Sequence, residues 1–544
     1  MWSREINLAL WLWSSVKGQR RRILLNCAIG IFRIALSLSF VYLCKHIVDI
    51  ATGTAQGDMK QWTMILVGYI LLQLTVTLVN GRIKERNRIE VTNLLQKKIF
   101  AKAMYSQWNG RDRFHTGDTM SRLSEDIRTV SATISDQIPR IVLASVQLIC
   151  ASFVLFTLER NLLWVLLVIM PIAIIVSKVY FRRLRRLTDK VRQQEGEIQS
   201  HIQEHLLKRI LIICMNRIDD AILLLNNRQD ELKDTVVSRV NYTTRANMFI
   251  QAGFMTGYSV TFCWGAYGIM AGTVTYGMMT AFLQLVNQVQ MPIVNMSHYL
   301  PGIIQSISSI YRLKEIDEET QMKDNNAESV SPDKEYGIKI EDLTYTYPGN
   351  SAPTINNLSE TFNPGEHIAI VGQTGAGKST LIRLLLGLLL PDKGSISITD
   401  GNETVTQGPD RKAFCYVPQG NSLMSGTIRD NLLLGNPIAT EEEMTNALRL
   451  AAADFVFERE EGLNTSCAEQ GNGLSEGQAQ RIAIARSLLQ PGSIYIFDEA
   501  CSALDEATET RILDNLDSHL KGKTVIWITH HESVRKRMSR IVSL

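Results

Sequence analysis

The chain has 544 residues, of which 45% are hydrophobic and 20% are charged. At roughly 150 residues per domain this length allows two to four domains, and the composition excludes a disordered, fibrous or small disulfide-stapled protein. Lys and Arg number 57 against 54 Asp and Glu, a formal net charge of +3, which gives no indication of nucleic acid as a partner. None of the eight cysteines forms a C-x-x-C pair, so neither a zinc site nor a thioredoxin-like motif is indicated.

Six apolar segments in the first part of the chain are long enough to cross a membrane as helices. They cover residues 23–50, 62–79, 138–157, 162–180, 246–271 and 276–304. Basic residues gather before the first segment, between the second and third, and between the fourth and fifth, so the positive-inside rule places these connections in the cytoplasm. The sequence therefore predicts a transmembrane domain over residues 1–318, with the N-terminus and everything after the sixth helix in the cytoplasm. A soluble domain with six buried helices is the alternative interpretation.

The two cytoplasmic connections within this domain are each about 60 residues long, which is unusual for a structureless loop. Both lack proline and are rich in Leu, Ile, Glu, Gln, Lys and Arg, so they are predicted to be helical extensions of the membrane segments. Residues 2–15 combine three tryptophans with charged side chains, which favours a helix lying at the membrane interface.

The rest of the chain has the pattern of a soluble α/β domain. A polar linker over residues 319–336 precedes a predicted ATPase domain over residues 337–544. Strands are predicted at 338–340, 367–371, 493–497 and 524–528, and a helix at 379–389. Short apolar strands that alternate with helices indicate a largely parallel sheet.

A glycine-rich loop stands between the predicted strand at 367–371 and the predicted helix. Its residues fit the phosphate-binding pattern G-x-x-x-x-G-K-[ST] and include Gly372, Gly375, Gly377, Lys378, Ser379 and Thr380. The glycines let backbone N–H groups wrap a phosphate, and the helix N-terminus adds its dipole. Lys378 is expected to reach the β- and γ-phosphates, and Ser379 to ligate Mg²⁺.

Two adjacent carboxylates, Asp498 and Glu499, end the predicted buried strand at 493–497. Next to a phosphate-binding loop, Asp498 is expected to help hold Mg²⁺ through water, and Glu499 to polarise the water that attacks the γ-phosphate.

The segment Leu474-Ser475-Glu476-Gly477-Gln478 resembles the signature sequence of ABC transporters, which is usually Leu-Ser-Gly-Gly-Gln. Other elements of that family occur in the expected order: Tyr347 matches the aromatic that stacks on adenine, Gln419 the Q-loop, Glu469 the acidic residue before the signature, Ser502 to Asp505 the D-loop, and His530 the switch histidine, with His531 as its neighbour. Residues 116–118 and 121–123 resemble the segment after the family's first coupling helix.

The resemblance covers nearly the whole chain and implies an exporter-type half-transporter with a fused ATPase domain in the cytoplasmic or inner membrane. It further implies ATP and Mg²⁺ as cofactors, with Tyr347, the P-loop, Ser475, Gly477 and Gln478 on ATP and with Gln419 near the metal. In this reading Glu499, His530 and Gln419 are catalytic. ATP lies between the P-loop of one subunit and the signature of the other, so a dimer is required. A homodimer is our preferred interpretation; one half of a heterodimer and an ATP-gated channel or regulatory subunit are the alternatives.

Two features of the sequence each allow more than one interpretation. Glu476 replaces the usual glycine of the signature, where it either repels the nucleotide slightly or points away. In the membrane domain, polar residues of the sixth helix lie broadly on one face, either as a cavity lining or as interhelical hydrogen-bonding groups. They are Gln284, Asn287, Gln288, Asn295 and His298, and Arg33 adds a charge within the first helix. Lipids or lipid-linked sugars, peptides and amphipathic drugs all remain candidate substrates.

Overall fold

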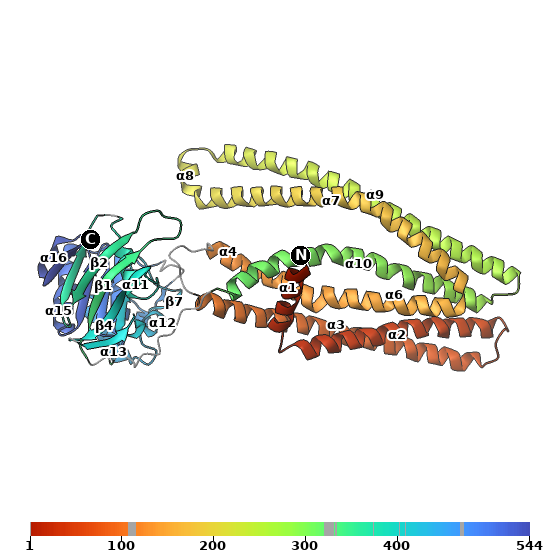
Figure 1. Cartoon of the computed structure of the whole chain (residues 1–544), viewed down its shortest axis with the longest axis horizontal. Coiled ribbons are helices and arrows are strands. Elements are labelled where there is room, and N and C mark those ends of the chain that lie inside the picture. Colours follow the sequence, from red (N-terminus) through yellow and green to blue (C-terminus); the bar gives the residue numbers. More distant parts are fainter. Residues whose placement is uncertain are drawn as a thin grey trace. The chain divides into compact units, whose positions relative to one another are not determined.

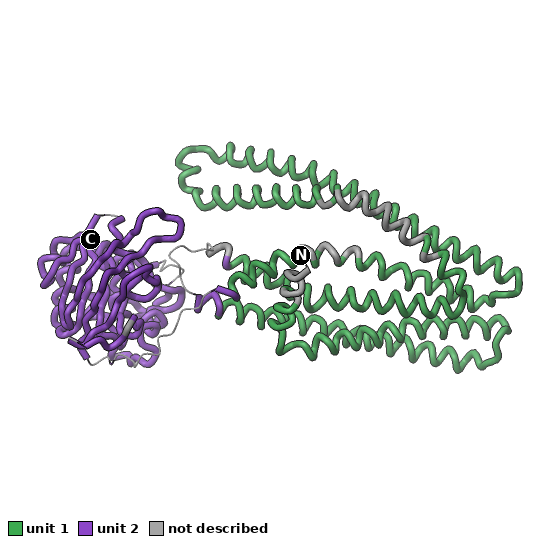
Figure 2. The backbone as a smooth tube through the Cα atoms, in the orientation of Figure 1, with its two compact units in different colours: residues 1–101, 120–317 green, residues 102–119, 318–544 purple. Residues whose placement is uncertain are grey.

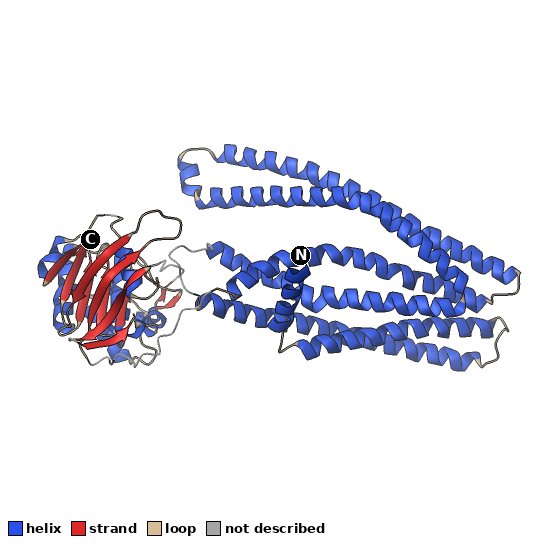
Figure 3. Ribbon diagram, in the orientation of Figure 1, coloured by secondary structure: helices blue, strands red, loops and turns tan. Residues whose placement is uncertain are grey.

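The computed structural model describes the backbone of all residues except 1, 107–115, 320–330, 332–333, 374, 402, 409 and 468–472. Most of the predicted linker and Glu469 therefore lie outside the described residues. The chain divides into two compact units, one formed by residues 1–101 and 120–317 and the other by residues 102–119 and 318–544 (Figure 2). The strands among the described residues belong to the second unit (Figure 3).

The first unit is helical, and each predicted membrane segment lies, to within one residue, inside one long helix. These helices are α2 (Arg20–Ala51), α3 (Met59–Met104), α6 (Ile138–Leu158), α7 (Arg160–Leu207), α9 (Ile218–Met270) and α10 (Tyr276–Asp317). The predicted helical extensions are confirmed, because α3, α7 and α9 continue 25 residues or more beyond their apolar segments. Helices satisfy every backbone hydrogen bond internally, which the hydrocarbon core demands. Within the described residues, α2, α3 and the helical segment 119–158 meet the length and composition of a membrane span.

The shorter helices of this unit are α1 (Trp2–Ser15), α5 (Ile127–Ala132) and α8 (Arg209–Cys214), with two π-helical turns at Arg122–Asp126 and Thr133–Gln137. The short helix α4 (Thr116–Ser121) contains the boundary between the two units. The core lies where α2, α6 and α10 pack together around Phe282, which is fully buried. Helices α7 and α9 run side by side and are joined by α8 at their ends (Figure 1).

The second unit contains two main sheets. The parallel sheet has the order β11-β3-β10-β9-β6, and the antiparallel sheet has the order β2-β1-β4-β5. The parallel strands are β3 (His367–Val371), β6 (Phe414–Val417), β9 (Ile494–Asp498), β10 (Thr524–Ile528) and β11 (Arg540–Ser543). The antiparallel strands are β1 (Gly337–Tyr345), β2 (Ile355–Phe362), β4 (Lys393–Asp400) and β5 (Glu403–Gln407), and β7 (Gly426–Thr427) pairs with β8 (Ser466–Cys467).

Helices flank these sheets. They are α11 (Lys378–Leu385), α12 (Ile428–Leu433), α13 (Glu441–Leu450), α14 (Glu476–Leu488), α15 (Glu506–His519) and α16 (Glu532–Arg537). Strands β9 and β10 are buried along their whole length, which explains their continuous apolar sequence. The prediction of an α/β domain behind a helical membrane domain is thus confirmed, while the sequence did not indicate the antiparallel sheet.

Candidate nucleotide site

The strand register brings four distant segments of the second unit to one edge of the parallel sheet. Ile370 of β3 lies opposite Ile528 of β10, and Ile528 lies opposite Asp498 of β9. Val417 of β6 lies opposite Phe497 of β9. Because the strands are parallel, the loops that follow all four of them begin at the same carboxyl edge, which is where open α/β sheets bind their ligands.

The glycine-rich loop follows β3 and leads into α11. Gly375 and Gly377 have φ values of +90° and +96°, a region that side chains with a Cβ rarely adopt. At Gly377 a Cβ would also come within 3.0 Å of the carbonyl oxygen of Thr354. The loop therefore requires these glycines in order to curl its backbone toward a ligand.

Lys378 begins α11 and is largely buried, at 9% exposure. Its Nζ donates hydrogen bonds to the carbonyl oxygens of Gly372 and Gln373, at 2.6 and 3.2 Å. These bonds hold the ammonium group within the curl of the loop. Ser379 is exposed beside it, so its hydroxyl is open to a ligand.

Tyr347 packs beside this loop. Its hydroxyl lies 3.2 Å from Oγ1 of Thr380 and accepts a hydrogen bond of 3.2 Å from Arg383. Its ring meets that of Tyr345 edge to face, with the centroids 5.1 Å apart. The aromatic residue predicted to stack on adenine is therefore adjacent to the phosphate-binding loop.

Asp498 and Glu499 occupy different environments although they are consecutive. Asp498 is 5% exposed, and burial together with the charge of Glu499 raises its pKa, while the hydroxyl of Tyr416, at 3.4 Å, opposes the rise. Glu499 lies just beyond the strand with φ of +50°, and its N–H donates to the carbonyl of Ile528. A non-glycine residue in this region carries strain of about 1–3 kcal/mol, and such strain is often found at functional sites.

Gln419 and His530 converge on the same glutamate. Nε2 of Gln419 lies 2.5 Å from Oε2 of Glu499, and Nε2 of His530 lies 3.6 Å from Oε1. The neighbouring His531 points elsewhere, with Nδ1 2.5 Å from the buried carboxylate of Glu509. Of the two histidines, the geometry thus brings His530 to the predicted site.

The signature segment forms the start of α14. Ser475 caps this helix and makes a reciprocal capping box with Gln478, since each side chain bonds the other's backbone N–H. Glu476 is exposed in the first turn. A Cβ on Gly477 would come within 2.7 Å of the carbonyl oxygen of Ala503, so glycine lets α14 approach the D-loop closely.

Gln480 joins the signature helix to the D-loop. It is 1% exposed, donates to the hydroxyl of Ser502 and accepts from the N–H of Ala503. Asp505, at the end of the D-loop, caps α15 by accepting the N–H of Thr508. The capping and bridging roles of these motif residues were not anticipated from the sequence.

The donor set at this edge fits a nucleotide with Mg²⁺. The hydroxyl of Ser379, the amide oxygen of Gln419 and the carboxylate of Asp498 are hard oxygen donors of the kind that magnesium prefers. The raised pKa of Asp498 reflects a negative charge that this structure leaves poorly compensated. A bound cation would compensate it.

The predicted substrate-path residues of the membrane unit are spread over several environments. Nε2 of Gln288 donates to the carbonyl of Ser37 on α2, whereas Asn287 and Arg33 are exposed. The side chain of His298 lies outside the described residues. Interhelical hydrogen bonding is thus shown for Gln288.

The sequence missed two polar clusters that tie α10 to its neighbours. Asp126, which is 2% exposed, accepts hydrogen bonds from Ser309 and Arg312. Asp317 accepts from the indole N–H of Trp11 at 2.8 Å and from Lys98 at 2.7 Å. Trp11, which we expected at the membrane interface, therefore anchors α1 to the end of α10.

Comparison with known proteins decides the family. A model of the ABC transporter transmembrane region matches residues 23–293, and the ABC transporter model matches residues 355–502. The chain belongs to the ABC transporters. It joins a transmembrane domain to a nucleotide-binding domain, as exporters of this family do.

Relatives of this ABC transporter extend over nearly its whole length. The Alpha-hemolysin translocation ATP-binding protein HlyB of Escherichia coli O157:H7 is 28% identical, over 98% of this chain and 76% of that protein. A multidrug export ATP-binding/permease protein of Staphylococcus aureus is also 28% identical, over 97% of this chain and 93% of that protein. A bacterial Atm1-family ABC exporter with ATP bound shares the fold, with a TM-score of 0.81 at 22% identity over 97% of this chain and 93% of that one. The chain is a multi-pass membrane exporter that binds and hydrolyses ATP.

Proposed function

We propose that two copies of this chain form an exporter in the cytoplasmic membrane that moves its substrate by alternating access. The observation that carries the proposal is the convergence of Lys378, Gln419, Glu499 and His530 at one sheet edge. In the proposed dimer, Ser475, Gly477 and Gln478 of one copy face the ATP held by the P-loop of the other. Ser475 is exposed at the N-terminus of α14 and is therefore available to such a partner.

Each residue at the edge has a proposed task. The P-loop backbone with Lys378 and Thr380 binds the phosphates, and Tyr347 stacks on adenine. Glu499 accepts the proton of the attacking water, His530 supports the γ-phosphate, and Gln419 positions Glu499 through its 2.5 Å contact. Mg²⁺, held by Ser379, Gln419 and Asp498, would neutralise charge that develops on the phosphate oxygens.

The apolar tip of the α7–α9 pair supports the involvement of a second chain. Leu207, Ile210 and Met215 are 83%, 79% and 62% exposed, although this part of the chain lies beyond the predicted membrane segments. Contiguous exposed apolar side chains outside a bilayer mark an interaction surface. We propose that the partner chain covers the outward face of this tip, which carries Leu207, Ile210 and Met215, and receives the motion that ATP binding produces.

ATP hydrolysis by the full chain in lipid nanodiscs tests the proposed site. Glu499→Gln keeps the size and the hydrogen-bonding capacity but removes the base, so turnover is expected to fall by about 100-fold or more. Glu506→Gln, an exposed carboxylate in the first turn of α15, is the matched control and should retain activity. Undiminished hydrolysis by Glu499→Gln would contradict the assignment of the base.

The mass of the purified complex tests the pairing separately. Two copies of the chain with wild-type hydrolysis are the expected result. A complex that contains a second, different half-transporter would replace the homodimer with a heterodimer, to which Glu476 could contribute an altered site. Steady open-channel currents across the bilayer would instead favour an ATP-gated channel.

A further inference from the structure

A cavity of 370 Å³ lies at the tip where the end of α7, the short helix α8 and the start of α9 meet. Eleven residues line it, and in the described structure none of them is acidic. Its volume falls in the range of small-molecule sites, which run from about 300 to 1,000 Å³. Neither the nucleotide site nor the proposed pairing of two chains assigns a role to this cavity.

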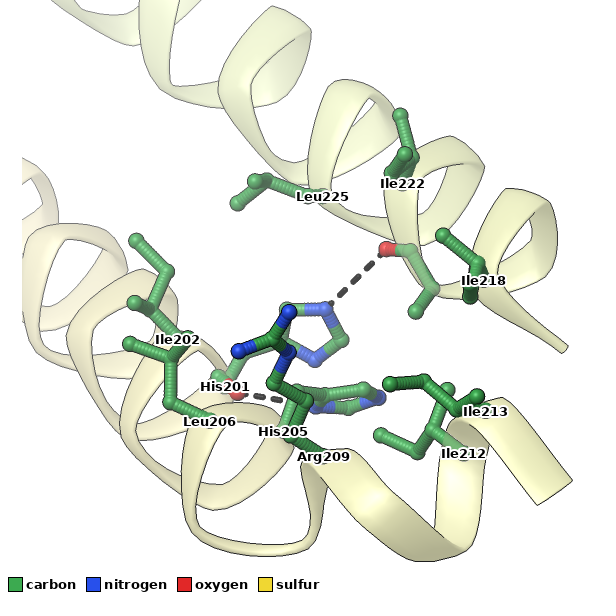
Figure 4. Close-up of a pocket in the computed structure, with 11 residues that line it drawn as sticks. His201, Ile202, His205, Leu206, Arg209, Ile212, Ile213, Ile218, Ile222 and Leu225 are labelled. Atoms are coloured by element: carbon green, nitrogen blue, oxygen red, sulfur yellow. Dashed lines mark hydrogen bonds between the residues drawn. The ribbon is translucent and has the colours of Figure 1, made fainter.

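The polar part of the lining consists of His201, His205 and Arg209. The two imidazole rings lie 3.8 Å apart between centroids, and Arg209 points toward them (Figure 4). His201 is 6% exposed, and its Nε2–H donates to the carbonyl of Ala221 on α9 at 3.3 Å. Nδ1–H of His205 donates to the carbonyl of His201 at 2.8 Å.

These two backbone bonds fix both rings and leave one nitrogen of each free for a ligand. The free atoms are Nδ1 of His201 and Nε2 of His205. Among the described residues, no carboxylate forms an ion pair with Arg209; the nearby Arg217 is paired with Asp220 at 2.7 Å, outside the cavity. The cavity therefore offers an unneutralised guanidinium beside two imidazoles.

The remaining walls are apolar. They comprise Ile202, Leu206, Ile212, Ile213, Ile218, Ala221, Ile222 and Leu225. A ligand that fits both parts has a single acidic group and a short hydrocarbon body. A bare inorganic anion would leave the isoleucines in contact with water, and an uncharged hydrocarbon would leave the basic groups unused.

A metal ion fits this cavity less well than an anion. His201 and His205 are four residues apart on one helix face, as in many metal sites. Zinc, however, needs three or four protein ligands, and no group of three potential ligands occurs among the described residues. The positive charge of Arg209, which lines the same cavity, would also repel a cation.

The position of the cavity restricts the source of the ligand. His201 lies 21 residues beyond Tyr180, where the predicted membrane segment of α7 ends. At 1.5 Å per residue this places the imidazoles about 30 Å from the hydrocarbon core. A lipid anchored in the bilayer does not reach that far, so the ligand comes from the aqueous phase.

We propose that this cavity binds a water-soluble amphipathic monoanion, with its acidic group at His201, His205 and Arg209 and its alkyl chain against the isoleucines. The ligand bridges α7, α8 and α9 and so stiffens the turn between the two long helices. It acts as an effector at the tip, separate from the transported substrate and from ATP. The outward-facing Leu207, Ile210 and Met215 do not line the cavity and stay available for the partner chain.

Octanoate is the probe that tests this site, used below its micelle-forming concentration. Its binding to the full chain in nanodiscs is measured by ligand-observed NMR, with empty nanodiscs subtracted. Arg209→Glu is expected to raise the dissociation constant for octanoate at least tenfold and to improve the binding of octyltrimethylammonium, which has an alkyl chain of similar length and the opposite charge. Arg217→Glu makes the same change of charge at the same tip but outside the cavity, and should alter octanoate binding by less than twofold.

A second variant separates loss of the site from loss of the fold. Ile222→Trp fills the apolar half without changing any charge, and should also weaken octanoate at least tenfold. Equal affinity of the wild type for octanoate and octyltrimethylammonium would mean a nonspecific apolar surface and overturn the proposal. Absence of octanoate binding, or octanoate binding that neither Arg209→Glu nor Ile222→Trp weakens, would overturn it as well. None of these outcomes depends on whether the chain pairs with itself.

Discussion

Polar residues serve different purposes at the sheet edge of the ATPase unit and at the helix contacts of the membrane unit. At the sheet edge, Gln419 and His530 meet Glu499, all three at least partly accessible and able to face a ligand. In the membrane unit, Asp126 and Asp317 are occupied by side chains of neighbouring helices. The same residue types thus position chemistry in one region and hold helices together in the other.

Sequence motifs are more informative about the sheet edge than about the helix contacts. Parallel strands with fixed register place the residues after each strand at a common edge, whatever their separation in the chain. A helix offers no such rule, because its rotation and its neighbours decide which side chains meet. Motif residues of the ATPase unit can therefore be assigned to one place before a structure is seen, whereas the partners of Asp126 and Asp317 cannot.

Replacing each of the two adjacent histidines by alanine is expected to have the largest effect. His530→Ala removes the contact to Glu499 and is expected to reduce ATP turnover by roughly 100-fold or more, the lower end of the usual range for a positioned catalytic side chain. Turnover of the full chain in nanodiscs, at saturating ATP, is the measurement.

His531→Ala is the matched control. It leaves the carboxylate of Glu509, which is 3% exposed, without its imidazole partner, so it should lower stability by about 1–3 kcal/mol while much of the turnover remains at low temperature. If His531→Ala abolished turnover in folded protein and His530→Ala did not, the two roles would have to be exchanged.

Features that leave a pattern in the sequence were predicted, whereas contacts between distant helices were not. The six long helices, their extensions and the α/β domain followed from apolar runs, proline-free connections and strand–loop–helix motifs. The docking of Trp11 on Asp317 did not, because tryptophan near a membrane predicts an interface and says nothing of a carboxylate 306 residues away. The π-helical turns were also missed, as was the β1–β2–β4–β5 sheet apart from the predicted strand at 338–340 within β1, since their sequences carry no periodicity that distinguishes them.

Glycine substitutions in the membrane unit test whether its contacts are as specific as those of the sheet edge. A Cβ on Gly277 would come within 2.4 Å of Oδ1 of Asp49 and of the carbonyl of Lys45, and the N–H of Gly277 donates to that carboxylate. Gly277→Ala is therefore expected to destabilise the chain by about 1–3 kcal/mol. Thermal inactivation in nanodiscs measures the effect.

Gly68→Ala on α3 is the control for the substitution itself. No atom lies within 4 Å of the added Cβ, so the change should be neutral or should stabilise the helix by about 0.5–1 kcal/mol. Equal effects at Gly277 and Gly68 would show that the contact at Asp49 contributes little.

The buried carboxylate of Asp498 at the sheet edge should lower the free energy of unfolding at neutral pH. A raised pKa means that the folded chain holds the proton of Asp498 more tightly than the unfolded chain does. The cost is absent below the ordinary aspartate pKa of about 3.9 and complete above the raised value. Asp498→Asn should therefore raise the unfolding temperature by about 2–4 °C at pH 7.5, with a gain that shrinks as the pH falls.

Asp505→Asn, in the same domain, should have the opposite effect and lower the unfolding temperature at neutral pH. The N–H and hydroxyl of Thr508 hold the pKa of Asp505 below its ordinary value, so its charge stabilises the fold at neutral pH and this contribution is lost on acidification. Calorimetry of the full chain over a pH series compares the two variants. A fall in unfolding temperature for Asp498→Asn at pH 7.5 would show that Mg²⁺ is not needed to relieve this carboxylate.

The smallest expected effect concerns Glu476, the departure from the family signature. Its carboxylate is exposed in the first turn of α14, where the helix dipole favours a negative charge by about 0.3–1 kcal/mol. Salt screens its repulsion of a nucleotide phosphate, because the Debye length is about 8 Å at physiological ionic strength. Glu476→Gly should lower the KM for ATP by no more than about threefold, and only at low salt.

The same substitution also changes the stability of helix α14. A glycine at that position weakens the first turn by about 1 kcal/mol, so the variant should unfold at a slightly lower temperature. Glu442→Gly, in the first turn of α13, carries the same helix penalty without facing the proposed nucleotide and should leave the KM unchanged. A tenfold or salt-independent change of KM in Glu476→Gly would show that Glu476 contacts the ATP directly, and the signature of this chain would then differ in function as well as in sequence.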